Sequence, residues 1–268
     1  MKDRIRLRPT SIANAIVVDG DQTRHRFARH SHDFYVVGVF TRGGQMSHYG
    51  LSDFEVETGD VVFIPPGEVH DGRPNGGIKD PRPRSYRMAY MGPGVFDQLA
   101  ASFNLRSPSE NAGLVRNIVF KQDQLLAGAA AGFLQALTKA TGLSDELVLA
   151  FGEFAGRAGH DRAGAPAAEL AVRIRKRMDE GADAVCELSE ELGLSRYALL
   201  RSFRSAYGLT PSDYRRHKRV ERSLTLIPGN RSLTEIAFAC GFFDQSHFIR
   251  DFKAVLGVTP GAYRQAIA

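Results

Sequence analysis

The chain has 268 residues, 43% of them hydrophobic and 24% charged, which is typical of soluble globular proteins and long enough for two domains. No apolar run reaches the roughly 18 residues of a membrane-spanning helix, and no apolar stretch follows the charged start Met1–Arg4. We therefore expect a cytoplasmic protein with no membrane partner, and the net charge of +5 favours an anionic partner where the basic residues cluster.

Short β-branched and aromatic runs fill residues 34–91. Examples lie at 34–37, 54–57, 60–64 and 86–90, and glycine and proline turns separate them. Runs of this length between turns predict an antiparallel barrel or sandwich.

The hydrophobic period becomes helical from about residue 123. Asp123 and Ser144 are candidate N-caps for helices over 124–140 and 145–158. The Gly- and Ala-rich stretch 156–166 has no apolar periodicity, which predicts an interdomain linker. We place the domains at 1–160 and 169–268, with 161–168 between them.

The last hundred residues contain an internal repeat. Leu199–Arg204 (LLRSFR) matches Phe248–Lys253 (FIRDFK), and Gly208–Pro211 (GLTP) matches Gly257–Pro260 (GVTP), both at an offset of 49 residues. A repeat of this kind indicates one supersecondary unit that is used twice.

Each copy predicts a helix, a glycine turn and a second helix. The first helices, over about 185–192 and 233–240, end at Gly193 and Gly241, because glycine tolerates the left-handed conformation that such a turn needs. This order is the helix-turn-helix arrangement.

Cap residues mark where these helices begin. Ser195 and Asp244 are candidate N-caps of the second helices, and Ser232-Leu233-Thr234-Glu235 is a capping box. Between the two units, Ser212 to Ile227 predicts one continuous helix, which would set the units about one DNA turn apart.

Basic residues crowd this region: nine lie between Arg196 and Arg231, against two acidic ones. Arginine pairs with guanine, glutamine with adenine and serine with several base edges. A solvated helix face is the alternative, but Arg201 and Arg250 recur at one position of the repeat, which packing does not require. We expect DNA contacts from Arg196, Tyr197, Leu200, Arg201, Arg204, Gln245, Ser246, His247 and Arg250.

The roles within this set differ. Arg201 and Arg250 are expected to contact bases or phosphates, whereas Arg196, Arg204, Arg215 and Arg216 are expected to contact phosphates. Base contact and a structural role both stay open for His247, and Leu200 either meets a thymine methyl or covers a neighbouring helix.

Residues 169–268 resemble the DNA-binding domain of the AraC/XylS family of bacterial transcription regulators. The resemblance places base-reading positions on Tyr197, Leu200, Arg201, Ser246, His247 and Arg250. Ser189 and Leu200 depart from the family pattern in the first unit. The signature is matched by Ile236-Ala237, Cys240-Gly241-Phe242, Gln245-Ser246-His247-Phe248, Arg250, Phe252-Lys253, Gly257-Val258-Thr259-Pro260 and Tyr263-Arg264.

Residues 25–95 resemble the cupin-like domain that many of these regulators carry, through His30-Ser31-His32 and the run Gly59–His70. The resemblance implies an α+β two-domain protein, in which a cupin-like β-barrel with a dimer-forming helical hairpin (124–158) precedes an all-α double helix-turn-helix.

Cupin enzymes usually bind a metal through His-x-His, a nearby glutamate and a later histidine. His30, His32 and His70 could meet, and such sites suit iron, manganese or zinc, but the glutamate is missing after His32. His48 is an unsupported fourth ligand. We therefore expect no metal, no cofactor and no catalytic residues, and we expect these histidines to line or close a ligand pocket.

A small barrel can hold one small ligand. Candidate effector contacts are Arg42, His70, Tyr86 and Arg87. Arg42 and Arg87 could clamp a carboxylate through paired hydrogen bonds, which favours an amino or organic acid, although either arginine could instead be a surface ion-pair partner.

These features predict an effector-controlled transcription regulator and not an enzyme. Its expected partners are promoter or operator DNA, a small-molecule effector, a second copy of the chain in a homodimer and, as a candidate, RNA polymerase. A metalloenzyme with a nucleic-acid module and a structural DNA-coating protein are the alternatives. Activation is the role that we assign, with repression as the alternative that the sequence leaves open.

Overall fold

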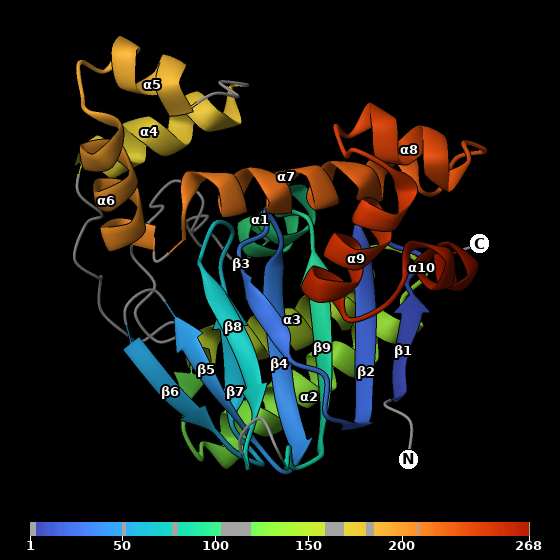
Figure 1. Ribbon diagram of the computed structural model, residues 1–268. Helices are drawn as coiled ribbons and strands as arrows, with labels where there is room; N and C mark the ends of the chain where they lie inside the picture. The colour runs from blue at the N-terminus through green and yellow to red at the C-terminus, as the bar shows by residue number, and fades with distance from the viewer. Residues whose placement is uncertain are drawn as a thin grey trace.

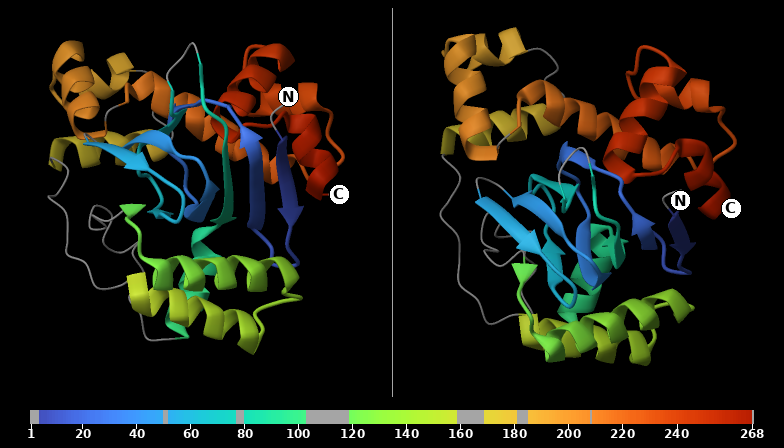
Figure 2. Two further views of the ribbon diagram at one scale, coloured as in Figure 1. Left: turned by 90° about the horizontal axis from the view of Figure 1, so that it is seen from below. Right: turned by 60° about the horizontal axis from the view of Figure 1, so that its bottom comes forward.

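The computed structural model describes residues 4–49, 52–76, 80–102, 119–158, 169–180, 185–207 and 209–267. Two β-sheets form the centre of the molecule, with the helices α2 and α3 on one side and the C-terminal helices on the other (Figures 1 and 2). The predicted α+β architecture with two domains is confirmed.

All strand pairs are antiparallel, as the short runs predicted. A six-stranded sheet has the order β1-β2-β9-β4-β7-β10, and a four-stranded sheet has the order β3-β8-β5-β6. The strands are β1 Arg4–Pro9, β2 Ala15–Thr23, β3 Phe27–His30, β4 Tyr35–Arg42, β5 Gln45–Tyr49, β6 Ser52–Val56, β7 Val61–Ile64, β8 His70–Pro74, β9 Arg84–Met91 and β10 Val119–Phe120.

Alternate residues of each strand point to opposite faces of the six-stranded sheet, and both faces carry buried side chains. On one face Phe40, Tyr86 and Met88 join the core between the two sheets. On the other face, Ala89 and Met91 belong to a second core that includes the helices.

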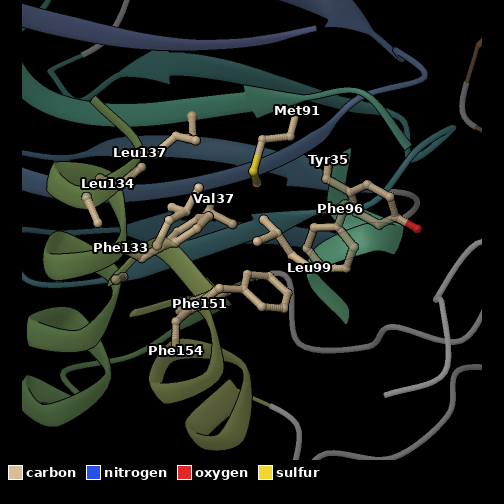
Figure 3. Close-up of a cluster of buried hydrophobic side chains, with 14 of the residues drawn as sticks. Tyr35, Val37, Met91, Phe96, Leu99, Phe133, Leu134, Leu137, Phe151 and Phe154 are labelled. Carbon is tan, nitrogen blue, oxygen red and sulfur yellow. The ribbon is translucent and has the colours of Figure 1, made fainter. Parts of the chain in front are cut away.

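That second core holds the predicted helical hairpin against the sheet. Helices α1 Pro93–Ala101, α2 Gln124–Lys139 and α3 Asp145–Ala158 supply its aromatic and leucine side chains, among them Phe133 and Phe151 (Figure 3). Asp123 accepts a hydrogen bond from the Leu126 amide, and Ser144 caps α3, so both predicted caps are confirmed. The predicted linker 161–168 lies outside the described residues.

The C-terminal domain contains the two predicted helix-turn-helix units, α5–α6 and α8–α9, with α7 between them. Gly193 and Gly241 have φ of 64° and 79°, the left-handed conformation that the turns require. Its helices are α4 Glu169–Asp179, α5 Val185–Glu191, α6 Arg196–Tyr207, α7 Pro211–Leu226, α8 Leu233–Ala239, α9 Gln245–Leu256 and α10 Pro260–Ile267.

The two domains pack against each other. Helix α9 contacts β3, α10 contacts β1, and α7 runs across the end of β3 (Figure 1). At Gly257, which ends α9 with φ of 77°, an added Cβ would lie 2.8 Å from Ile5 Cδ1 and 3.1 Å from the Phe27 ring. The end of α9 therefore lies in close contact with β1 and β3.

Candidate functional sites

Helix α6 has the two faces that the repeat predicted. Leu199 and Phe203 are fully buried, whereas four of the predicted DNA contacts are exposed. Tyr197 is the most open of the aromatic side chains on this helix, and the guanidinium of Arg201 lies 5.8 Å from the centre of its ring. The exposed set is Arg196, Tyr197, Arg201 and Arg204.

Leu200 differs from its neighbours on α6. It is half-buried and packs against the core that α4, α5 and α6 share. Covering a neighbouring helix is thus the role that its surroundings favour, and contact with a thymine methyl stays a prediction.

Helix α9 exposes fewer of its predicted contacts. Ser246 and Arg250 are exposed, and the Arg250 side chain keeps 73% of its surface accessible. Gln245 accepts a hydrogen bond from the Thr234 hydroxyl at 2.8 Å. Two residues of the predicted set therefore face open space, while Gln245 is held by α8.

His247 is held within the fold. Its Nε2 lies 3.0 Å from the buried Asp251 carboxylate, and its ring packs edge-on against Phe242 at 5.4 Å. These contacts favour the structural role that the sequence left open for this histidine.

Arginines of α7 supply basic charge between the two units. Arg216 lies 3.0 Å from Asp213 and 3.9 Å from Asp251, so it already has acidic neighbours. Arg215 donates a long hydrogen bond to Ser212 and is part of the same helix. Both remain predicted phosphate contacts.

Three histidines, His30, His32 and His70, form a buried histidine cluster beside α7. His30 ends β3 and pairs directly with His70 at the start of β8. Ring centroids lie 4.3 Å apart for His30–His70, 4.8 Å for His32–His70 and 5.7 Å for His30–His32. Burial lowers the pKa of His30 to about 4, that of His32 to about 3 and that of His70 well below its usual value, so all three rings are neutral at physiological pH.

A fourth histidine, His217, reaches the cluster from α7. It is 2% exposed, and its ring lies 6.0 Å from that of His30. Sequence analysis missed it because it sits in a basic run that resembles a solvated face. The available signal was its spacing of three from Tyr214 and from Val220, both of which are also buried.

Polar contacts between the two domains lie beside His217. The Asp33 carboxylate accepts a hydrogen bond from Lys218, and the Asp33 amide donates to the Glu221 carboxylate. Lys218 also lies 3.1 Å from Glu221. Residues next to the histidine cluster thus connect the barrel to α7.

The four predicted effector contacts lie in different places. Tyr86 is in the core between the sheets, and His70 is in the histidine cluster. Arg87 points to the face of β9 opposite to Tyr86 and lies 2.6 Å from the Asp19 carboxylate. Arg42 is exposed at the end of β4. The structure does not bring Arg42 and Arg87 together, because the alternation of β9 separates Arg87 from the barrel interior.

A different recess gathers arginines. It has a volume of about 700 Å³ and lies beside β5, β6 and the end of β8. We call it the arginine recess, and Arg24, Arg26, Arg73, Arg82 and Glu55 line it together with Met46 and residues 74–76 and 81. A second recess of about 300 Å³ lies between the domains, where β1 and β2 face α7 and α10, and apolar side chains dominate its lining.

Fold and surface together define a two-domain protein with a β-barrel ligand domain and a DNA-binding domain made of two helix-turn-helix units. A family model described as an AraC-like ligand binding domain matches residues 14–150, and one described as a helix-turn-helix domain matches residues 188–266. The chain belongs to the AraC family of DNA-binding transcription regulators.

Relatives along most of the chain carry regulatory names. The chain is 26% identical to the MmsAB operon regulatory protein of Pseudomonas aeruginosa, over 91% of this chain and 79% of that protein. It is 25% identical to the transcriptional activator RhaS of Escherichia fergusonii, over 89% and 88% of the two chains. These relatives are transcription regulators rather than enzymes.

Solved structures share the fold of the whole chain. ToxT of Vibrio cholerae aligns with a TM-score of 0.58 over 95% of this chain and 97% of its own, at 11% identity. None of the helices in the described part of the chain has both the length and the apolar character that crossing a bilayer requires.

Proposed function

We propose that this chain binds specific DNA sites through α6 and α9 and that a small-molecule effector bound to its N-terminal domain controls that binding. The contact between the two domains carries the proposal, since α7, α9 and α10 pack on β3 and β1. A ligand that prefers either the docked or the released arrangement would shift the balance between them.

Exposure divides the DNA-binding residues by role. We propose base contacts from Arg201, Ser246 and Arg250, because their side chains are open on the second helix of each unit. Arg196 and Arg204 flank Arg201 on the same exposed surface and are proposed to contact phosphates.

We propose an effector that carries a carboxylate. The arginine recess supports this class, because four guanidinium groups and one glutamate line it and its volume suits a small organic acid. Arg42 and Arg87 remain an alternative pair, although Arg87 is engaged by Asp19.

A homodimer completes the proposed assembly, with RNA polymerase as its partner at a promoter. The hairpin α2–α3 supports the dimer, because Leu125 and Leu149 are 69% and 68% exposed on its outer side. Exposed large apolar side chains on neighbouring helices are typical of protein interfaces.

Selection of bound duplexes from a random DNA pool, followed by footprinting, tests the DNA half of the proposal. We expect protection of a few related sites with half-sites about one helical turn apart. Uniform coverage without a preferred sequence would instead support a structural DNA-coating protein.

Thermal shift of the full chain with amino acids, organic acids, sugars and neutral apolar compounds tests the effector half. A binder at 100 times its Kd adds about 2.7 kcal/mol to the free energy of unfolding. Replacing both Arg26 and Arg82 by alanine should remove the response if the arginine recess is the site, whereas replacing both Arg42 and Arg87 should not. A response confined to neutral apolar compounds would contradict the acid proposal and point to the interdomain recess.

A further inference from the structure

The hydrogen bonds of the histidine cluster define which ring nitrogen of each residue carries a proton. The Nδ1 atoms of His30, His32 and His70 lie 2.7, 3.0 and 2.9 Å from the backbone carbonyls of Ala28, Phe34 and Glu68. A carbonyl only accepts, so each Nδ1 carries the hydrogen. Each Nε2 is therefore left with a lone pair and no proton.

The three Nε2 lone pairs have no donor among themselves. The Nδ1 hydrogen of each ring is directed at a carbonyl and a neutral imidazole has one N–H, so none of the rings can donate from Nε2 to another. A single water molecule has two hydrogens and can satisfy two of the three acceptors at most. The Nε2 of His32 is buried without a hydrogen-bond partner among the described residues, which leaves an uncompensated cost at this position.

A cation with open coordination positions satisfies all three lone pairs at once. The candidate ligand atoms of His30, His32 and His70 lie within 4.8 Å of one another. Around a tetrahedral ion with bonds of about 2.0–2.1 Å the nitrogens are about 3.4 Å apart, so the three rings must move closer together when the ion binds. Nδ1–H bonds to carbonyls are also the outer contacts that orient histidine ligands of metals.

We propose that His30, His32 and His70 bind a divalent first-row transition-metal ion, best matched by Zn²⁺, and that His217 of α7 faces its open position. Three neutral imidazoles favour this class of ion over Mg²⁺ or Ca²⁺, which prefer oxygen ligands.

His217 makes the site span the two domains. It is buried, and its Nδ1 has no hydrogen-bond partner in the part of the chain that the structure describes, so the helix holds an unsatisfied nitrogen beside the cluster. A metal ion shared between the cluster and His217 would stabilise the docked position of α7 beyond what Lys218, Asp33 and Glu221 contribute. Metal binding and domain docking are thereby linked, independently of the proposed effector.

Metal binding is tested on the full chain after chelation and buffer exchange. One equivalent of Zn²⁺ should bind and raise the unfolding temperature. Co²⁺ should give the visible absorption of a nitrogen-ligated ion, since such spectra report the ligand set directly. A single site holds one equivalent of metal ion, so binding of less than about 0.1 equivalent of either ion by the wild-type chain would overturn the proposal.

Variants identify the ligands. His32→Gln and His70→Asn should each weaken Zn²⁺ binding by more than the roughly 10–100-fold that loss of an outer contact costs, whereas His48→Gln should leave it unchanged. His48 is the matched control because it lies on β5, bonded to Asp53, outside the cluster. Equal Zn²⁺ affinity in wild type and in a folded His32→Gln or His70→Asn variant would contradict the assignment. If both variants fail to fold, the Co²⁺ spectrum of the wild type still decides whether histidines ligate the ion.

His217→Gln tests the link to docking. We expect the barrel to retain the ion with a changed Co²⁺ spectrum, and we expect Zn²⁺ to slow amide exchange of α7 in the wild type but not in this variant. If the variant matches the wild type in spectrum and in α7 exchange, the interdomain part of the proposal is wrong.

Discussion

Arg201 and Arg250 occupy the same position of the repeat, but their surroundings differ. Arg201 lies over the Tyr197 ring, whereas Arg250 has Asp251 as its acidic neighbour within the described ranges, at 3.9 Å. An arginine without a strong protein partner is free to adopt the paired geometry that guanine requires. The second unit therefore offers the more direct test of base recognition.

Arg250→Ala should cost about 1–3 kcal/mol of DNA-binding free energy at one base position and relax the sequence preference there. The measurement is a binding titration against a panel of sites with single base changes. Lys253→Ala, one turn further along the exposed side of α9, is the matched control for losing a positive charge. An even loss of affinity across the panel would assign Arg250 to the phosphates instead.

At the scale of helices, the start of α8 shows how local chemistry defines a boundary. The Ser232 hydroxyl accepts from the Glu235 amide at 3.1 Å, and the Glu235 carboxylate accepts from the Ser232 amide at 2.7 Å. These reciprocal bonds satisfy two amides that the helix itself cannot satisfy.

Ser232→Ala should lower the free energy of unfolding of the C-terminal domain by about 1 kcal/mol, because the cap is lost. Urea denaturation followed by circular dichroism measures the change. Thr225→Ala removes a hydroxyl from an exposed position within α7 and should be neutral or slightly stabilising, since alanine is the better helix former. Equal effects of the two substitutions would argue against a role for the capping box.

Helices and strands followed closely from local patterns in this chain. The spacing around Asp123, Ser195 and Asp244 placed caps that the structure confirms. Strands β1 and β2 were not predicted, although β1 alternates arginine with apolar residues, because their apolar pattern is weaker than that of the runs after residue 34.

At the scale of the molecule, the junction of α9 with the barrel depends on a residue without a side chain. Gly257 combines a left-handed φ of 77° with a virtual Cβ position 2.8 Å from Ile5 Cδ1. Gly241 has a similar φ of 79°, but its virtual Cβ has no neighbour nearer than 3.5 Å. The two positions therefore separate the cost of the backbone conformation from the cost of domain contact.

Gly257→Ala and Gly241→Ala should each lose about 1 kcal/mol of stability through the left-handed conformation. Only Gly257→Ala should also loosen the docking of the C-terminal domain, which faster amide exchange in β1 and β3 would report. If both substitutions change amide exchange in β1 and β3 equally, contact between the domains is not the cause of the change.

The sequence alone determined the double helix-turn-helix, its caps and glycine turns, the antiparallel barrel and the helical hairpin, because the hydrophobic periods, turn residues and caps that predict them are local patterns in the chain. The tertiary structure decided what depends on distant segments. It joined His217 to the histidine cluster across almost 190 residues of chain (217 − 30 = 187), and it paired Arg87 with Asp19 rather than with Arg42. It also covered Leu200 and held His247 on Asp251. No local period encodes which face of one domain packs against another, so these partners became visible only once the chain was folded.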